Sequence, residues 1–216
     1  MKRKKFLLII AMTIMTFSIV LPSEAATIEK NANVAVMDFG THPGAVPIDI
    51  NVLNVGKAAS EYVINYLFES KTLDIMDRFM VEDVIAEEKL NTTGLIDPDT
   101  AKRIGELLNA KYIIYGNVND VTLSDVGTQI GVSGVTICTV KSHLIVRMMN
   151  VETGDIICAS KGEGKSKSSY VKIKGGNIAT VTIGKAKVTQ DSVHNAIQKA
   201  SDQAVAILLD RLGLKR

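Results

Sequence analysis

The chain has 216 residues, of which 46% are hydrophobic and only 5% aromatic, and its formal net charge is +2. Four basic side chains and one acidic side chain lie in residues 1–25, so the remaining part carries a charge of about −1. This balance excludes a protein that binds nucleic acid through a sustained basic face. About 190 residues remain, which is enough for one domain with a hydrophobic core. Because Trp is absent, aliphatic side chains must supply most of that core.

The N-terminus has the pattern of an export signal. Lys2–Lys5 form a basic segment, and Phe6–Leu21 is an uncharged run of sixteen residues that a proline follows. Ser23 and Ala25 put small residues at −3 and −1 of a cleavage site before Ala26. A membrane anchor that stays in place is the alternative, but the run is shorter than the ~20 residues that span a bilayer. We therefore predict a signal peptide that is cleaved between Ala25 and Ala26.

The prediction of export bears on domain organisation and anchoring. Residues 1–25 would be the signal, and residues 26–216 would form a single domain. The two cysteines, Cys138 and Cys158, lie far downstream of the apolar run. We therefore expect no lipid on a cysteine at the mature N-terminus.

The first half of the mature chain alternates between strand and helix patterns. An apolar run at 34–39 predicts a strand, and the Pro and Gly residues in 40–51 predict a loop. Asp97-Pro98-Asp99 is a helix-capping signal. The expected elements are a helix at 55–70 with Ala59, Val63, Tyr66 and Leu67 buried, a strand at 73–76, a helix at 78–90 with Val81, Val84 and Ile85 on one face, a helix after the cap with Ala101, Ile104, Leu107 and Leu108 buried, and a strand at 111–118.

From Val121 onward the apolar residues alternate with period two, which is typical of hairpin strands. Segments 135–149 and 155–161 flank a turn at 150–154, and segments 170–174 and 178–183 flank Gly175-Gly176-Asn177. Segment 120–141 fits two further strands around 127–134, although Asp125 and Gln129 interrupt their alternation. A closing helix is expected between 192 and 212, with the apolar set Val193, Ile197, Ala200, Ala204, Ile207, Leu208 and Leu212. Early helices, late strands and one terminal helix predict a three-layer α/β (α+β) domain.

Segment 159–166, ASKGEGKS, fits the loosest form of the phosphate-loop pattern. Such a loop needs a strand before it and a helix after it, so that backbone amides and the lysine surround phosphate groups. Residues 167–174 are instead rich in serine and then alternate as a strand does. We therefore expect Lys165 and Ser166 to bind no nucleotide.

No residue group has the spacing of a catalytic or metal site. The three histidines, His42, His143 and His194, have no close histidine or cysteine of the kind found in zinc sites. We therefore favour surface or packed histidines over a metal site.

Three aspartates, Asp38, Asp74 and Asp77, lie at or beside strand ends, where catalytic carboxylates are common. No base or metal-ligand cluster accompanies them in the sequence. We favour helix capping, or pairing with Arg78, over catalysis. The protein is therefore expected to be no enzyme and to use no cofactor.

Export makes a disulfide between Cys138 and Cys158 a candidate. If the turn at 150–154 centres near Glu152, Cys158 lies opposite residues near Arg147, while Cys138 lies opposite residues near Lys167. The offset is about nine residues, or ~30 Å along a strand, which is far beyond bridging distance. We expect two free thiols.

Four segments carry a resemblance to a known family, namely VAVMDFG at 34–40, Met76-Asp77-Arg78 with the following helix, Gly94–Gly105 leading to Ala110–Gly116, and Asn150–Ile157. Together they resemble the curli secretion-channel (CsgG) family. Its relatives include lipoprotein activators of penicillin-binding proteins and the N-terminal domain of TolB-like proteins. The resemblance extends roughly over residues 34–212. It implies a periplasmic α/β domain with extended β-hairpins, which in the curli channel join several subunits in the outer membrane.

This sequence departs from the family channel in three ways. The channel is a lipoprotein, whereas this chain lacks the lipidation cysteine. The channel's constriction loop carries an aromatic residue, whereas segment 40–55 has none. Membrane strands need ~9–11 alternating residues and aromatic belts, whereas Tyr170 is the only aromatic residue in segment 168–187.

Segment 168–187 is the candidate membrane or partner hairpin. Its apolar residues alternate with lysines and threonines, so one face of the hairpin would be apolar. The apolar positions are Val171, Ile173, Ala179, Val181 and Ile183.

The resemblance implies an oligomeric protein of the cell envelope, in the periplasm or at the periplasmic face of the outer membrane. It would assist the secretion or assembly of a surface polymer such as curli-like fibres, with a secreted polymer subunit or another envelope protein as partner. The alternative is a non-channel periplasmic interaction module that resembles the activators of penicillin-binding proteins. An exported hydrolase has no residue constellation to support it, and no nucleic-acid partner is expected.

Overall fold

The structure is a computed structural model, and it describes residues 28, 32–46, 54–87, 97–130, 133–174, 180–184 and 190–214. For residues 129–130, 133, 170, 172–174 and 180–184 it describes the backbone only. Three residues singled out from the sequence, Ala25, Ala26 and Ala179, lie outside the described residues.

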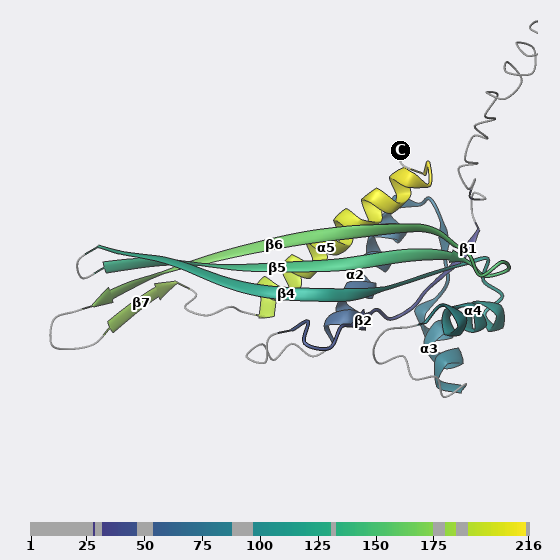
Figure 1. Ribbon diagram of the computed structural model, residues 1–216, viewed down its shortest axis with the longest axis horizontal. Coiled ribbons are helices and arrows are strands. Elements are labelled where there is room, and N and C mark those ends of the chain that lie inside the picture. Colours follow the sequence, from purple (N-terminus) through teal and green to yellow (C-terminus); the bar gives the residue numbers. More distant parts are fainter. Residues whose placement is uncertain are drawn as a thin grey trace, which may run out of the picture.

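Seven strands form one mixed sheet in the order β3-β1-β4-β5-β6-β7, with β2 paired to β4 (Figure 1). The strands are β1 (Asn33–Val36), β2 (Gly40–Thr41), β3 (Asp74–Ile75), β4 (Tyr112–Ile130), β5 (Ser133–Asn150), β6 (Ile156–Lys174) and β7 (Thr180–Gly184). The helices among the described residues are α2 (Val55–Ser70), α3 (Arg78–Glu87), α4 (Pro98–Leu107) and α5 (Gln190–Arg211). The predicted three-layer α/β class with extended hairpins and a C-terminal helix is confirmed.

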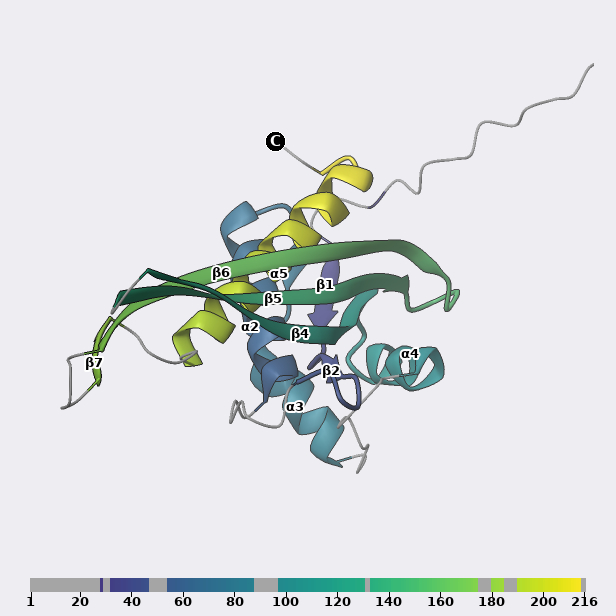
Figure 2. The same ribbon diagram turned by 60° about the vertical axis from the view of Figure 1, so that its left-hand side comes forward.

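One end of the sheet is covered on both faces, and we call this part the body. There β1 runs parallel to β3 and to the first residues of β4. Val34 and Val36 point into a core beneath α2 and α5, whereas Ala35 and Met37 point into a second core beneath α3 and α4. Figures 1 and 2 show α3 and α4 on the side of the sheet opposite α5. Burial on both faces explains why 34–37 is a continuous apolar run rather than an alternating one.

The other end of the sheet extends past the body as a long arm (Figure 1). We define the arm as residues 120–130 of β4, 133–143 of β5 and 163–174 of β6, together with β7. The β4–β5 ladder continues as far as Ile130 opposite Ser133, and the β6–β7 ladder joins Tyr170 with Gly184 and Lys174 with Thr180. The hairpin predicted within 120–141 and the hairpin predicted around Gly175-Gly176-Asn177 are therefore both present.

The sequence prediction ended β4 at Val118, but the strand continues to Ile130. The register shifts between Val118 and Asp120, where a bulge inserts Asn119. A bulge moves the side chains that follow it to the opposite face of the sheet. Before the bulge, the odd-numbered residues of β4 lie on the face covered by α3 and α4. After the bulge, the even-numbered residues lie on that face. Because the alternation of apolar residues changes from odd to even positions at Asn119, the sequence pattern indicated two strands where the structure has one.

Helix α4 begins where the sequence predicts. The Asp97 side chain accepts a hydrogen bond from the backbone N–H of Thr100 at 2.9 Å. The prediction that Leu107 is buried is wrong, because it is 49% exposed. The buried positions follow the spacing i, i+3, i+4 and i+7 from Ala101, which selects Gly105 and Leu108 and leaves position 107 off the stripe.

Helix α5 crosses β5 and β6 on the same side of the sheet as α2 (Figure 2). Of its expected apolar set, Ile207 and Leu212 are only partly buried, and Val205 and Leu209 are buried in addition. Its backbone lies unusually close to β6: a Cβ on Gly162 would be 1.8 Å from the carbonyl oxygen of Ala200. Small residues on β6 therefore set the distance between this helix and the sheet.

The segment after β1 is not only a loop. Gly40–Thr41 forms β2, which pairs in parallel with Asn117 and Val118 of β4. The backbone leading into β2 also abuts α2, since a Cβ on Gly56 would lie 1.9 Å from the carbonyl oxygen of Phe39. Open α/β sheets bind nucleotides at the carboxyl ends of such strands, and here the chain itself fills that position.

Candidate interaction surface

The ASKGEGKS segment lies in the middle of β6, with strand on both sides. Its even positions, Ser160, Gly162, Gly164 and Ser166, are buried beneath α5. Its odd positions, which include Lys161, Glu163 and Lys165, are exposed on the opposite face of the strand. The pattern that resembles a phosphate loop is therefore an alternation of small residues under a helix and charged residues in solvent.

We call the face of the arm that carries Lys165 the open face. Described side chains on this face between β4 and β6 are exposed or half-buried, whereas Val121, Val140 and Ser142 on the other face are buried. Its first row next to the body is polar: His143 Nδ1 lies 2.8 Å from Asp120 Oδ2, and its Nε2 lies 3.7 Å from Glu163 Oε2. The next row places Lys141 directly opposite Lys165.

Towards its end the open face becomes apolar. Val126 is 68% exposed, Val135 48% and Ile137 44%. Val126 lies opposite Ile137, and Thr128 lies opposite Val135, which in turn lies opposite Val171 of β6. These five residues, Val126, Thr128, Val135, Ile137 and Val171, form what we call the tip face.

The predicted apolar residues of the second hairpin fall in register with the tip face. Val171 is half-buried and pairs with Ile183 of β7, and Ile173 pairs with Val181. Only the backbones of the last three are described. Their apolar role stays a prediction, but the pairing places Ile183 in the row of Val135, and Ile173 and Val181 in the next row, which begins at Ser133.

The sequence analysis did not predict that the hairpin of β4 and β5 contributes apolar residues to this surface. The register arithmetic that separated the two cysteines also brings Val135 opposite Val171, and the Gly175-Gly176-Asn177 turn brings Val171 opposite Ile183. Applied across both turns, that arithmetic would have predicted one apolar row over three strands, formed by Val135, Val171 and Ile183.

The outer edge of β6 is closed by side chains from α5. Gln203 accepts a hydrogen bond from the backbone N–H of Glu163 at 2.6 Å, and Lys199 donates to the carbonyl oxygen of Lys165 at 3.1 Å. Arg211 donates to the carbonyl oxygen of Ala159. An edge strand whose backbone groups are bonded in this way is protected against pairing with another chain.

The two edges of the arm's end are not closed in this way. On β4, the last partner on the outer side is Ala45, whose carbonyl oxygen accepts from the N–H of Val121 at 2.6 Å. Beyond it, within the described part of the chain, β4 pairs only with β5, and β7 pairs only with β6. Among the described residues, the tip face therefore lies between two strand edges that have no further partner strand.

The Met76-Asp77-Arg78 segment holds the body together rather than forming a reactive site. Arg78 forms an ion pair with Asp38, and its Nε lies 3.1 Å from Glu61 Oε1 and 2.9 Å from Glu82 Oε1. Burial alone lowers the pKa of Arg78, but the surrounding carboxylates outweigh it and raise that pKa above its ordinary value. Asp77 accepts a hydrogen bond from the N–H of Phe79 at 2.7 Å and so caps α3. The pairing and capping interpretation is confirmed for Asp38 and Asp77.

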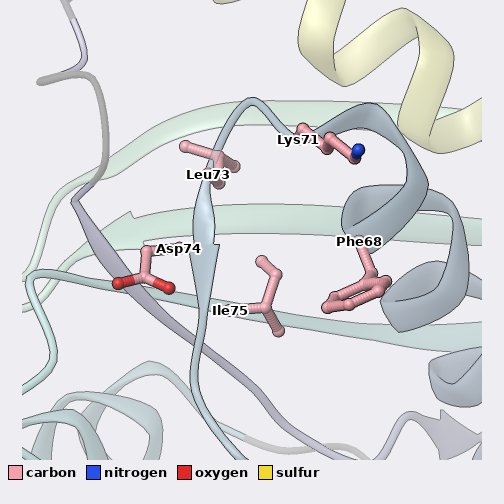
Figure 3. Close-up of a pocket in the computed structure, with 5 residues that line it drawn as sticks. All are labelled: Phe68, Lys71, Leu73, Asp74 and Ile75. Atoms are coloured by element: carbon pink, nitrogen blue, oxygen red, sulfur yellow. The ribbon is translucent and has the colours of Figure 1, made fainter.

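Asp74, the third aspartate, is exposed beside a shallow pocket of about 430 Å³. Figure 3 shows Phe68 and Ile75 on one side of β3 and the Asp74 carboxylate pointing the other way. Leu73 and Lys71 complete the lining. This pocket brings together no pair of groups suited to acid–base or nucleophilic catalysis.

Each histidine has its own local contacts, and the two cysteines lie in different rows of the sheet. His42 lies beside Pro43, and Tyr62 Oη lies 3.2 Å from His194 Nδ1. No group of three or more His, Cys, Asp or Glu residues among the described residues is placed to hold a metal ion. Cys158 pairs with Met148 and Cys138 with Ser168 across β5 and β6, so the predicted register and the two free thiols are confirmed.

No helix within the described ranges is both long and apolar enough to cross a membrane.

Distant structural similarities accompany this geometry. The C-terminal domain of LpoB from Escherichia coli has 14% identity and a TM-score of 0.43, over 63% of this chain and 84% of that one. A lipoprotein from Neisseria meningitidis has 11% identity and a TM-score of 0.45, over 84% and 98%. PelC from Paraburkholderia phytofirmans, solved as a dodecamer, has 13% identity and a TM-score of 0.38, over 88% and 92%.

No curated protein sequence matches this chain significantly. The family model for the curli production assembly/transport component CsgG matches residues 18–214, which is nearly the whole chain. The chain therefore belongs to the CsgG family.

Proposed function

We propose that this protein is an exported envelope protein that acts by assembly, not by bond chemistry. Copies of the chain would associate side by side through the arm, and the assembly would assist the secretion or assembly of a surface polymer such as curli-like fibres. The observation that carries the proposal is the exposed tip face between the two open edges of β4 and β7.

The strand edges support association between copies. Exposed edges invite pairing with other chains, and proteins usually protect them. This chain closes the edge of β6 with Lys199, Gln203 and Arg211, yet comparable contacts are absent from the described edges of β4 beyond Val121 and of β7. Pairing β4 of one copy with β7 of the next would satisfy both edges.

The exposed side chains support the same proposal. Val126, Val135 and Ile137 are contiguous across β4 and β5, and contiguous apolar surface usually marks a site of interaction. In a side-by-side assembly the tip faces of successive copies would merge into one apolar band.

The length of the tip face supports the alternative of a non-channel interaction module. From Val126 to Ile130 β4 has five residues, or ~17 Å at 3.3–3.4 Å per residue. The apolar band of a membrane-crossing sheet is ~25 Å tall. A short band suits contact with another envelope protein, such as an enzyme that the module activates, better than a full crossing.

The experiment that tests assembly places one cysteine on each open edge. Ser124→Cys on β4 and Ile183→Cys on β7 belong to the same face of the sheet. Oxidation of the double variant should give a ladder of covalent oligomers, whereas either single variant has no introduced cysteine opposite it in this contact and should stay monomeric. The mass of the wild-type protein with and without detergent gives the size of the assembly. A double variant that stays monomeric under oxidation would leave the interaction module as the function.

A further inference from the structure

Strand β3 is the outermost strand of the sheet in the body, at the end opposite β7. The backbone N–H groups of Asp74 and Met76 donate to the carbonyl oxygens of Ala32 and Val34, at 3.4 and 3.0 Å. Successive residues of a strand direct their N–H and C=O groups to alternate sides, so those of Ile75 point away from β1. No residue in the described ranges forms a hydrogen bond with either group of Ile75. The outer edge of β3 is therefore available to a further strand.

This edge borders the shallow pocket of about 430 Å³, which we call the edge groove. Phe68, at the end of α2, lines the groove although it is 74% exposed. Figure 3 shows its ring beside the side chain of Ile75. The protein thus presents an aromatic ring and an unpaired backbone donor and acceptor at one place. A ligand that covers the ring would remove apolar surface from water.

The edge groove also carries a positive charge. Lys71, which follows α2, lines the groove, and no carboxylate among the described residues forms an ion pair with this lysine. The carboxylate of Asp74 points to the other side of β3 (Figure 3). The side of β3 on which Phe68 and Ile75 lie therefore favours an acidic ligand over a basic one.

We propose that the edge groove binds an acidic, extended peptide segment of another protein, which adds to the sheet as a strand beside β3. Peptides bind open sheet edges in this way, because backbone hydrogen bonds give affinity and pockets for alternate side chains give specificity. Here Ile75 would supply the backbone partners, Phe68 the apolar contact and Lys71 the charge. A compact apolar ligand would fill the groove but would leave both backbone groups of Ile75 unpaired. The inference goes beyond the proposed function, since it places a partner on the body and uses neither β4 nor β7.

The test uses two blocked peptides as probes, acetyl-Val-Thr-Val-Thr-Val-Glu-amide and the same peptide with Lys in place of Glu. Titration calorimetry with the purified chain should show saturable binding of both peptides. The Glu peptide should bind about fivefold more tightly, which is the upper range for an exposed ion pair. Lys71→Gln should remove this difference, whereas Lys57→Gln, which changes a lysine outside the groove, should keep it.

The aromatic contact is tested by a matched pair of variants. Phe68→Ser should weaken binding of the Glu peptide at least tenfold, because it removes most of the apolar contact, which is worth roughly 1.5–3 kcal/mol for a fully buried ring. Phe79 is 76% exposed and does not line the groove. Phe79→Ser should therefore bind the peptide as the wild type does.

Addition as a strand is tested on the peptide itself. Methylation of the backbone nitrogens of the valines, or of those of the threonines, removes one alternate set of N–H donors. Only one set of a bound strand faces β3, so one methylated peptide should lose binding and the other should keep it. Amide hydrogen exchange of Ile75 should also slow when the unmethylated Glu peptide binds.

Three results would overturn the proposal. The first is the absence of saturable binding of either peptide at millimolar concentration. The second is binding that Phe68→Ser leaves unchanged, which would place the peptide on the edges of the arm. The third is a wild-type dimer that Phe68→Ser abolishes, which would assign the groove to a second copy of the chain. Cross-linking of Ser124→Cys with Ile183→Cys in the Phe68→Ser background tests assembly through the arm separately, so the two proposals fail independently.

Discussion

The body and the arm use the same sheet in opposite ways. In the body, β1 and the start of β4 are buried on both faces, and Ile113 and Ile114 point into different cores. In the arm, β4, β5 and β6 are buried on one face at most, and the other face carries charged and apolar side chains in solvent. The buried side chains are thus concentrated in the body and beneath α5, and the open face contributes little to the core.

The covered faces of the two regions also differ in kind. The body packs large aliphatic side chains such as Leu67 and Ile104. Beneath α5, β6 instead presents serines and glycines, and the helix backbone lies almost on the strand. Close packing of backbones gains many dispersion contacts but leaves no room for a methyl group. The region beneath α5 should therefore be the part of the fold most sensitive to added volume.

The first prediction tests that sensitivity. Gly164→Val should lower the free energy of unfolding by about 3 kcal/mol, the upper end of the usual range for overpacking, because a Cβ at this position would lie 1.7 Å from the carbonyl oxygen of Ala196. Urea denaturation followed by circular dichroism gives the value. Lys165→Ala, one residue further on the open face, is the matched control and should change stability by no more than about 0.5 kcal/mol. Equal effects of the two variants would contradict the observation that one face of β6 is buried beneath α5 and the other is exposed.

Sequence patterns predicted the body well, because burial on both faces and helix capping leave strong local signals. The cap at Asp97, the helix at 55–70 and the pairing of Asp38 with Arg78 follow from local signals and from charges near each other on neighbouring elements. The arm was predicted in pieces. The bulge at Asn119 changed which positions of β4, odd or even, face the core. Strand prediction depends on a regular alternation of this kind.

For a related reason, the sequence predicted only the part of the candidate surface that lies on the second hairpin. The pattern of a single hairpin shows which of its residues alternate, but a surface over the four strands β4 to β7 requires the registers of three turns to be combined. Val171 was found from its own strand, whereas Val126 and Ile137 were missed because Asp125, which points to the opposite face, interrupts the alternation beside Val126 in the sequence.

The second prediction concerns the charged cluster in the body. Arg78→Met should lower the free energy of unfolding by about 1–3 kcal/mol, because it leaves the partly buried carboxylate of Asp38 without its partner. Denaturation at neutral pH measures the loss. The double variant Arg78→Met with Asp38→Asn should recover part of it, since no unpaired charge remains. A double variant less stable than Arg78→Met would show that the cluster does not act as a pair.

The third prediction uses the contact between α2 and α5. Burial, and then the charge of Glu69, raise the pKa of Asp202 above its ordinary value. The ionised carboxylate therefore opposes folding at neutral pH, and this cost disappears as the pH falls through the raised pKa. Asp202→Asn should raise the melting temperature by a few degrees at pH 7 and should lose that advantage near pH 4. A gain that is equal at both pH values would rule out ionisation as its cause.

The smallest effect on stability and the largest on assembly are expected at the end of the arm. Val181 lies in β7 opposite Ile173, in rows that continue the tip face. Val181→Arg should leave the circular dichroism and melting temperature of the detergent-free monomer unchanged, because the body and α5 hold the fold without this position. It should abolish the oligomers extracted from membranes, since it buries an unpaired charge in the proposed apolar contact between neighbouring copies. Lys187→Arg, a substitution in the same segment that keeps the charge, is the control. If the monomer unfolds instead, Val181 belongs to a core. The proposal that the body and α5 stabilise the fold while the arm makes the contacts between copies would then be wrong.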